Sequence, residues 1–323
     1  MDGARRLLAI AMMLASSPAL AIEGSTLAGP IGGTDIRQAH LPPPGWYGGA
    51  AALGLEAYDF TGPDGRSVPA LSAINLQRAR AGVFLLYVPE FQLFGGSFGV
   101  LGVGSHGVDC GRLFAFTQKR CITGLGDPYG EIAWTRHFGT VRQSRYPDAF
   151  PIFEGLSVAF GFGVVFPVGR YDAFMANNHG VTPGNNIWDF APNVAVTYVT
   201  PPILADGTEI SGKLFWNNYL TNPETDYKTG SVLNVDFAVT ERIGRWQIGA
   251  AGLYAVQVED DKQFGMIVPP DGHRGEILQL GGIISYDMPE QMATAKVKVL
   301  ETIFSVNTVK VHGVVFTFAK KLP

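Results

Sequence analysis

From about residue 46 onward, the chain alternates apolar and polar residues over stretches of strand length. The clearest stretch is Trp246–Val258, in which every second residue counted from Trp246 is apolar or glycine. Successive side chains of a strand point to opposite faces, so one face of such a strand can meet lipid and the other water. The preceding stretch, Val232–Ile243, alternates in the same way, and the residues around Gly244 leave room only for a tight hairpin turn.

The same pattern predicts about twelve strands in all. They are Trp46–Asp59, Leu71–Val88, Ser97–Gly107, Leu125–Phe138, Phe153–Phe166, Trp188–Val199, Glu209–Leu220, Val232–Ile243, Trp246–Val258, Glu276–Tyr286, Ala293–Phe304 and Val309–Phe318. No apolar run after the N-terminal leader is long enough for a membrane-spanning helix. We therefore expect an all-β fold, an antiparallel transmembrane β-barrel in the bacterial outer membrane.

An even number of strands places both termini on the periplasmic side, with short turns there and longer extracellular loops. The four longest connections then lie outside the cell. They are around Cys110–Cys121, Pro167–Ile187, Thr221–Gly230 and Glu259–Gly275.

The first residues have the parts of a secretory signal: a basic start, an apolar stretch and an A-x-A site at Ala19–Ala21. We expect residues 1–21 to be a cleavable signal peptide and residues 22–44 a periplasmic N-terminal segment. The barrel then covers residues 45–318, and residues 319–323 form a C-terminal tail. No linker or charge block divides the chain into further domains.

Composition agrees with a membrane wall. Charged residues make up 16% of the chain and glycine 41 of its 323 residues, against roughly 25% and 7% in soluble domains. The formal charge of −4 makes the chain a poor ligand for nucleic acid. The two cysteines, Cys110 and Cys121, lie close together in an exported chain, which favours a disulfide over two free thiols.

Strand parity places polar and charged side chains opposite the lipid face, where they would line the lumen. An Arg or Lys side chain that faced lipid in the middle of the membrane would cost about 2–4 kcal/mol. The charged positions of each strand must therefore be the ones that face the lumen. The lumen candidates are Glu56, Arg78, Arg80, Asp127, Glu131, Lys213, Asn217, Asn234, Asp236, Gln257, Gln279, Lys296 and Lys298. They would form a constriction that contacts solute, or a structural ion-pair network that fills the barrel. A barrel of twelve strands has room for both.

Two sequence motifs of soluble enzymes occur in the chain, but the elements predicted around them do not fit the motifs. Gly102–Gly107 fits G-x-G-x-x-G and Gly95–Gly99 fits G-x-S-x-G, but each needs a following helix where this pattern predicts strands. The six histidines show no metal-ligand spacing. We expect no metal and no cofactor. Asp172 and His179, which share one long loop, are the residues that an outer-membrane hydrolase would use.

Pro128 and Pro192 fall inside predicted strands, where proline removes a ladder donor. Either the strand boundaries differ there, or the wall is locally unpaired. An unpaired wall would permit solute to leave the lumen sideways into the bilayer.

Several loop and strand-end motifs resemble a bacterial family of outer-membrane proteins of the meta-pathway of phenol degradation, over nearly all of the mature chain. The matching residues are Leu41–Gly45 with Tyr47, Gly124–Asp127, Pro167–Asp172, Gly184–Trp188, Pro192 with Thr197 and Tyr198, Asn222–Gly230, and Gln257 with Asp260. The family pattern has threonine where this chain has Val168, and serine more often than Thr229. The resemblance implies a transporter-like β-barrel associated with uptake of aromatic or other hydrophobic compounds, and no catalytic residues.

We therefore predict a non-enzymatic channel for passive uptake of small aromatic or hydrophobic solutes, with Tyr171, Asp172 and Trp188 lining an outer vestibule. Its partners would be outer-membrane lipid, the solute, and the barrel-assembly machinery during insertion. A general diffusion porin, a structural barrel and the hydrolase remain alternatives.

Overall fold

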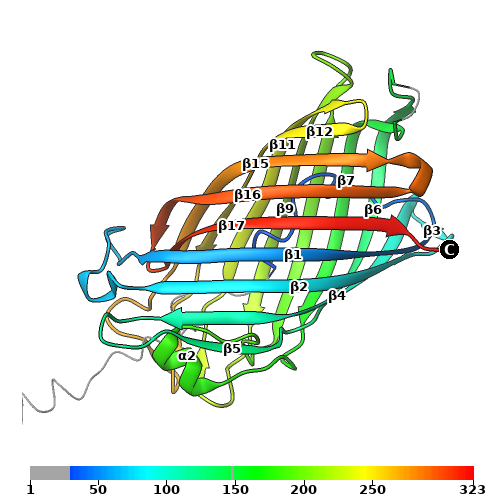
Figure 1. The fold of residues 1–323 in the computed structure, drawn as a ribbon. Coiled ribbons are helices and arrows are strands. Elements are labelled where there is room, and N and C mark those ends of the chain that lie inside the picture. The colour runs from blue at the N-terminus through cyan, green and yellow to red at the C-terminus, as the bar shows by residue number, and fades with distance from the viewer. Residues whose placement is uncertain (1–29, 147–148) are drawn as a thin grey trace, which may run out of the picture.

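The computed structural model describes residues 30–146 and 149–323, so the predicted signal peptide lies outside the described residues. Within the described part of the chain, most strands form one antiparallel sheet that closes on itself (Figure 1), and three short strands of the loops form a small second sheet. Closure comes from the pairing of β1 (Gly45–Phe60) with β17 (Val309–Lys321), in which Tyr47 lies opposite Lys321. The predicted transmembrane β-barrel is confirmed.

Twelve strands build the wall formed by the described residues, since β3 and β5 are short segments beside β4. Besides β1 and β17 these strands are β2 (Asn75–Val88), β4 (Gly96–Arg112), β6 (Tyr129–Arg142), β7 (Ile152–Val165), β8 (Asp189–Val199), β9 (Gly207–Tyr219), β11 (Val232–Ile243), β12 (Trp246–Gln257), β15 (Glu276–Met288) and β16 (Ala293–Val306). The short strands are β3 (Gln92–Leu93), β5 (Arg120–Leu125), β10 (Tyr227–Lys228), β13 (Lys262–Gln263) and β14 (Met266–Ile267).

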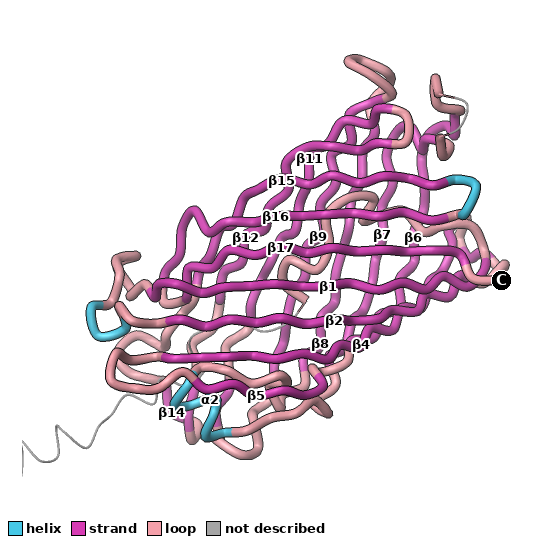
Figure 2. The backbone as a smooth tube through the Cα atoms, in the orientation of Figure 1, coloured by secondary structure: helices cyan, strands magenta, loops and turns pink. Residues whose placement is uncertain are grey.

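Among the residues that the structure describes, helices lie only in the connections between strands, as Figure 2 shows. They are η2 (Pro69–Leu71), α2 (Ala173–His179) and η3 (Pro289–Gln291). None of the described helices is long and apolar enough to cross a membrane. The helix α2 and the longer loops lie at the end opposite the C-terminus (Figure 1). In outer-membrane barrels that end is external, and the end with both termini is periplasmic.

The two faces of the wall differ in the way that the alternation predicts. On β17, Val314 and Phe316 point outward and are each 45% exposed, whereas Asp236 on β11 points inward and is fully buried. Near the periplasmic end, Trp46 stacks on Tyr87 across β1 and β2, with ring centroids 4.5 Å apart. Aromatic rings at this depth are typical of the interfacial girdle of a membrane barrel.

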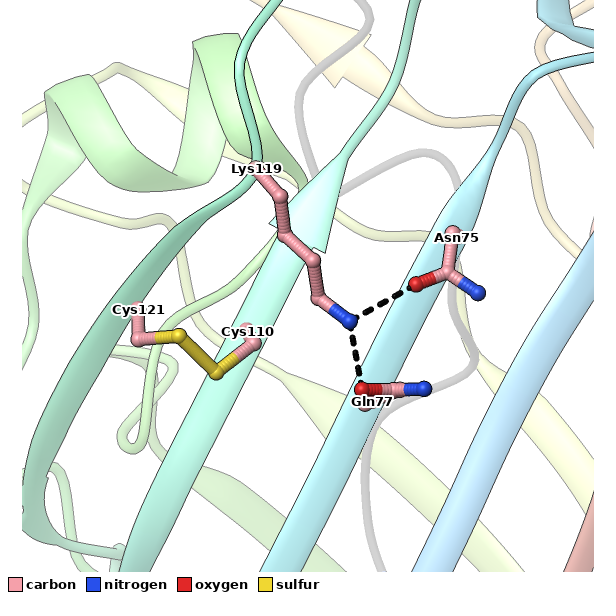
Figure 3. Close-up of a disulfide and its surroundings, with 5 residues drawn as sticks. All are labelled: Asn75, Gln77, Cys110, Lys119 and Cys121. Atoms are coloured by element: carbon pink, nitrogen blue, oxygen red, sulfur yellow. Dashed lines mark hydrogen bonds between the residues drawn. A yellow bond between two sulfur atoms is a disulfide. The ribbon is translucent and has the colours of Figure 1, made fainter.

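The region around Cys110 and Cys121 is not the long loop that the sequence predicted. Cys110 lies in β4 and Cys121 in β5, directly opposite each other, and a disulfide joins them. Figure 3 shows this bond, and beside it Lys119, which donates hydrogen bonds to Asn75 and Gln77. The alternation is weak in β5, because Gly124 and the preceding basic residues interrupt it, and this hid the strand.

The stretch before β1 is also placed differently from the expectation. Residues 30–41, which we call the lumenal segment, run inside the barrel rather than in the periplasm. Figure 1 shows this dark-blue stretch between the front and back walls, and hydrogen bonds tie it to inward-facing residues of β7, β8, β9, β11, β12, β15 and β16. At the other end of the chain, β17 continues to Lys321, so most of the predicted tail is strand.

Candidate functional site

The interior of the barrel holds several buried ion pairs, and the first of them fastens the lumenal segment. Asp35 is 3% exposed, and its carboxylate lies 2.5 Å from Lys296 Nζ and 3.1 Å from Lys298 Nζ. Burial alone would raise the pKa of Asp35, but the two ammonium groups outweigh it and lower the pKa to about 2. Lys298 also donates to the carbonyl oxygens of Gly32 and Thr34. One lysine side chain thus holds three points of the segment.

A second ion pair fastens the segment to the periplasmic half of β15. The guanidinium of Arg37 donates to both carboxylate oxygens of Asp287, at 3.1 and 2.6 Å, and to Gln247 Oε1. Arg242 approaches the same Asp287 carboxylate at 3.1 Å. A bidentate guanidinium–carboxylate contact fixes the orientation as well as the position of the chain.

The buried carboxylate of Asp236 binds the start of the lumenal segment. It accepts hydrogen bonds from the backbone N–H groups of Gly32 and Thr34 and from the Thr34 hydroxyl. Gly32 has a φ of +72°, and a Cβ there would lie 2.8 Å from Leu253 Cδ2. A glycine is therefore needed where the segment passes this wall.

Glu131 and Lys213 form a further ion pair between β6 and β9. Lys213 Nζ lies 2.6 Å from Glu131 Oε1, and each residue is less than a tenth exposed. Tyr129 donates its hydroxyl proton to Glu131 Oε2, and the Lys213 ammonium lies 4.8 Å from the ring centroid of Phe215. The sequence predicted both charged residues in the lumen but not their pairing, because they are 82 positions apart.

Arg78 and Arg80 point into the barrel from β2 toward its external end. Both contact Asp109 on β4, at 3.1 and 2.5 Å. Arg80 also donates to the carbonyl oxygen of Thr182, in the connection between β7 and β8. The two arginines thus join the wall to that connection.

Asp127 fastens the same connection, residues 166–188, which we call the outer loop. Its two carboxylate oxygens accept from the backbone N–H groups of Gly169 and Asn185. A Cβ at Gly169 would lie 2.7 Å from this carboxylate, so the close approach requires glycine. Asp127 therefore holds a loop in place, whereas the sequence placed it on the lumen wall.

The two prolines have different explanations. Pro128 lies between β5 and β6, so there the predicted boundary of the strand was wrong. Pro192 lies inside β8, and the ladder to β9 is interrupted opposite it: pairing stops after Phe190 and resumes at Asn193. Asn218 fills part of the gap by donating to the carbonyl oxygens of Phe190 and Trp216. The wall is locally unpaired at Pro192.

Two further predicted site residues lie elsewhere. Trp188 does not line the lumen: its ring stacks on Phe190, with an interplanar angle of 5°, and packs edge-on against Phe166 on the outer face. Glu56 also faces outward, beside His312 and Gln77, because the inward position on β1 belongs to the buried Ala57. The predicted alternation on β1 was shifted by one residue, so Glu56 was wrongly placed on the lumenal face.

The two residues that the hydrolase alternative would use, Asp172 and His179, belong to one short helix. Asp172 caps α2 by accepting from Met175 N, and His179 lies in the last turn of the same helix. His179 comes seven positions after Asp172, which is a rise of roughly 10 Å along the helix and too far for a direct acid–base relay. Tyr171 precedes the cap and is half-buried. In the described ranges, no group of three His, Cys, Asp or Glu side chains is arranged to hold a metal ion.

Sequence reasoning missed several partners of the predicted residues. Asp109 and Asp287 lie just beyond the predicted ends of their strands, and extending the parity of β4 and β15 by two residues would have found them. Asp35 and Arg37 carry no such signal, because the lumenal segment has no strand periodicity.

A closed antiparallel barrel with a charged, segment-filled interior and aromatic rings on its outer face defines a β-barrel of the outer-membrane class. The chain belongs to the family described as "Putative MetA-pathway of phenol degradation", which matches residues 113–318. This confirms the resemblance seen in the sequence.

Among solved structures, the fold is similar to the COG4313 outer membrane channel from Pseudomonas putida F1. The TM-score is 0.69 at 10% identity, over 89% of this chain and 98% of that chain. The NanC porin is more distant, with a TM-score of 0.44 at 8% identity, over 84% of this chain and 100% of that one. No curated protein matches the chain.

Proposed function

We propose that the protein lets small aromatic or hydrophobic solutes cross the outer membrane passively. The observation that carries the proposal is membership of a family described by phenol degradation, which covers residues 113–318. The closed barrel supplies a path through the bilayer without a helix bundle or an energy source. Because the family is described by the degradation of phenol, its description supports an aromatic solute rather than a sugar.

The charged interior supports a passage with weak, repeated contacts. Arg78 and Arg80 at the external end, then Glu131 with Lys213, and finally Lys296 and Lys298 beside the lumenal segment, offer hydrogen-bond partners along the barrel. Contacts with a solute must stay weak for it to leave. In this proposal the same pairs also stabilise the barrel, so they would combine the two roles considered from the sequence.

Influx into proteoliposomes tests the proposal. Phenol, benzoate and a sugar of matched size are compared in vesicles with and without the purified protein. We expect the protein to accelerate phenol and benzoate entry several-fold more than sugar entry. Equal acceleration of all three would contradict the proposal and leave a general diffusion porin, which the polar interior also supports.

The unpaired stretch at Pro192 favours a sideways exit for hydrophobic solutes. A Pro192→Ala variant restores a backbone N–H donor, which allows the ladder to β9 to close. We expect slower phenol entry and unchanged sugar entry in this variant. Unchanged phenol entry would leave only the axial route.

A further inference from the structure

A cavity of about 160 Å³ lies between the lumenal segment and the barrel wall. Residues 38–41 of the segment form one side of it, and inward-facing residues of β2, β4, β6, β7 and β9 form the other. The cavity therefore exists only while the segment occupies the barrel.

Most of the cavity is apolar. Leu86, Leu101, Ala133 and Ala159 line it from the wall, and Leu41 lines it from the segment. An apolar cavity of about 150 Å³ in another protein is large enough to bind benzene. A single aromatic ring therefore fits this volume, whereas a fused-ring compound or a disaccharide does not.

One part of the cavity is polar, because Glu131 and Lys213 also line it, together with Gln38, His40 and Thr135. Glu131 and Lys213 are the ion pair among these residues. In the described part of the chain, Lys213 Nζ makes one hydrogen bond, to Glu131 Oε1. An ammonium group has three N–H donors, so Lys213 can still donate to a ligand. Lys213 is 7% exposed, and bulk water therefore does not satisfy these donors fully.

The charges of this pair select the protonation state of the ligand. Glu131 and Lys213 compensate each other, so a buried carboxylate ligand would bring two negative charges to one positive charge. An uncompensated buried charge is strongly unfavourable. A neutral hydroxyl, in contrast, can accept from Lys213 and donate to Glu131 at the same time.

We propose that this cavity is a binding subsite for neutral one-ring phenols, with the ring between Leu101 and Ala159 and the hydroxyl at the Glu131–Lys213 pair. The inference rests on the proposed function and deepens it. It places a binding site on the solute's path at the level of β6 and β9, and it names the protonation state of the ligand that this subsite prefers.

Fluorine NMR tests the subsite with 4-fluorophenol and 4-fluorobenzoate as probes. The full-length protein in detergent micelles is titrated at neutral pH, and empty micelles correct for partitioning. We expect saturable binding of 4-fluorophenol and at least tenfold weaker binding of 4-fluorobenzoate. Equal affinity for the two probes, or no saturation by 4-fluorophenol, would overturn the proposal.

A larger side chain placed in the cavity should block the ligand, and the same side chain placed on the outer face of the barrel is the matched control. Ala133→Leu should weaken 4-fluorophenol binding at least tenfold, and Ala81→Leu, which adds the same side chain to the exposed outer face of β2, should leave it unchanged. Ala159→Val is a smaller filling that keeps the test valid if Ala133→Leu does not fold. Folding is read from the heat-dependent mobility shift on gels. Wild-type affinity in a folded filling variant would contradict the subsite.

Transport separates this inference from the proposed function. If phenol still enters proteoliposomes faster than the sugar while 4-fluorophenol binding is absent, the subsite fails and the proposed function stands. If phenol has no advantage over the sugar, the proposed function fails whatever the binding data show.

Discussion

The lumenal segment lies inside the barrel and the outer loop lies at its external end (Figure 1), and different forces hold them. The lumenal segment is held by charge, through Asp35 with two lysines and Arg37 with Asp287. The outer loop is held by backbone hydrogen bonds to Asp127 and by the apolar contacts of Met175 and Val181.

The difference predicts how each part responds to change. Buried ion pairs are strongly destabilised when one partner is lost, because the other remains an uncompensated charge. Apolar packing has no such dependence on charge or pH. We therefore expect the lumenal segment to be the part that leaves its place on charge removal, and the outer loop to stay.

Removal of Lys298 should have the largest effect. Lys298→Met takes away one of the two ammonium partners of Asp35 and the donor to Gly32 and Thr34, while Lys296 stays beside Asp35. Loss of a buried partner costs up to about 3–5 kcal/mol. The segment should then leave the lumen, and single-channel conductance in planar bilayers should rise several-fold. The exposed Lys320→Met on β17 serves as the control. Wild-type conductance in Lys298→Met would show that the segment does not obstruct the current.

Acid should release the same segment in two steps. Burial, with Arg37 and His137 nearby, lowers the pKa of His40 to about 3 from an ordinary 6.5, so its neutral form stabilises the segment fully above pH 6.5 and loses this effect as the pH falls toward 3. Asp35, with its pKa lowered to about 2 from 3.8, stabilises the segment fully above pH 3.8 and loses this effect toward pH 2.

Conductance measured from pH 8 to pH 3 checks this expectation. It should be constant above pH 7 and increase below pH 6.5. In His40→Gln, which can still bond to Ser157 but does not titrate, the increase should begin only below about pH 4. An increase that begins at the same pH in both proteins would assign the effect to another group.

Loss of the Asp127 carboxylate should loosen the outer loop by a smaller amount. Asp127→Asn leaves one carbonyl oxygen for two backbone donors, and a buried donor without a partner costs about 1–3 kcal/mol. Hydrogen exchange of residues 167–187 should become faster while conductance changes little. The exposed Asp64→Asn is the control. Unchanged exchange would mean that the apolar contacts alone hold the loop.

The disulfide should have the smallest effect on the interior. Cys110 and Cys121 face outward on β4 and β5 and are 11 positions apart in the chain. Their joint replacement by serine should speed hydrogen exchange in β5, because the free chain gains entropy, and leave conductance unchanged. A change in conductance would show that β5 supports the lumen.

The amino-acid sequence determined the barrel itself. Alternation placed β11 at Val232–Ile243 as observed, and parity placed Arg78, Arg80, Lys213 and Lys298 inward, because hydrocarbon excludes a charge whatever its partner. Those rules depend only on the environment on each side of the wall.

The tertiary structure alone decided which inward charges pair and what fills the lumen. Glu131 and Lys213 meet because of the registers of all the strand pairs between β6 and β9. Asp35 and Lys296 are in contact although they are 261 positions apart. Residues 30–41 have no periodicity, since their hydrogen bonds go to a wall that closes around them rather than to a neighbouring strand. Their place in the barrel follows from charges on β11, β15 and β16, which only the folded sheet brings close to one another.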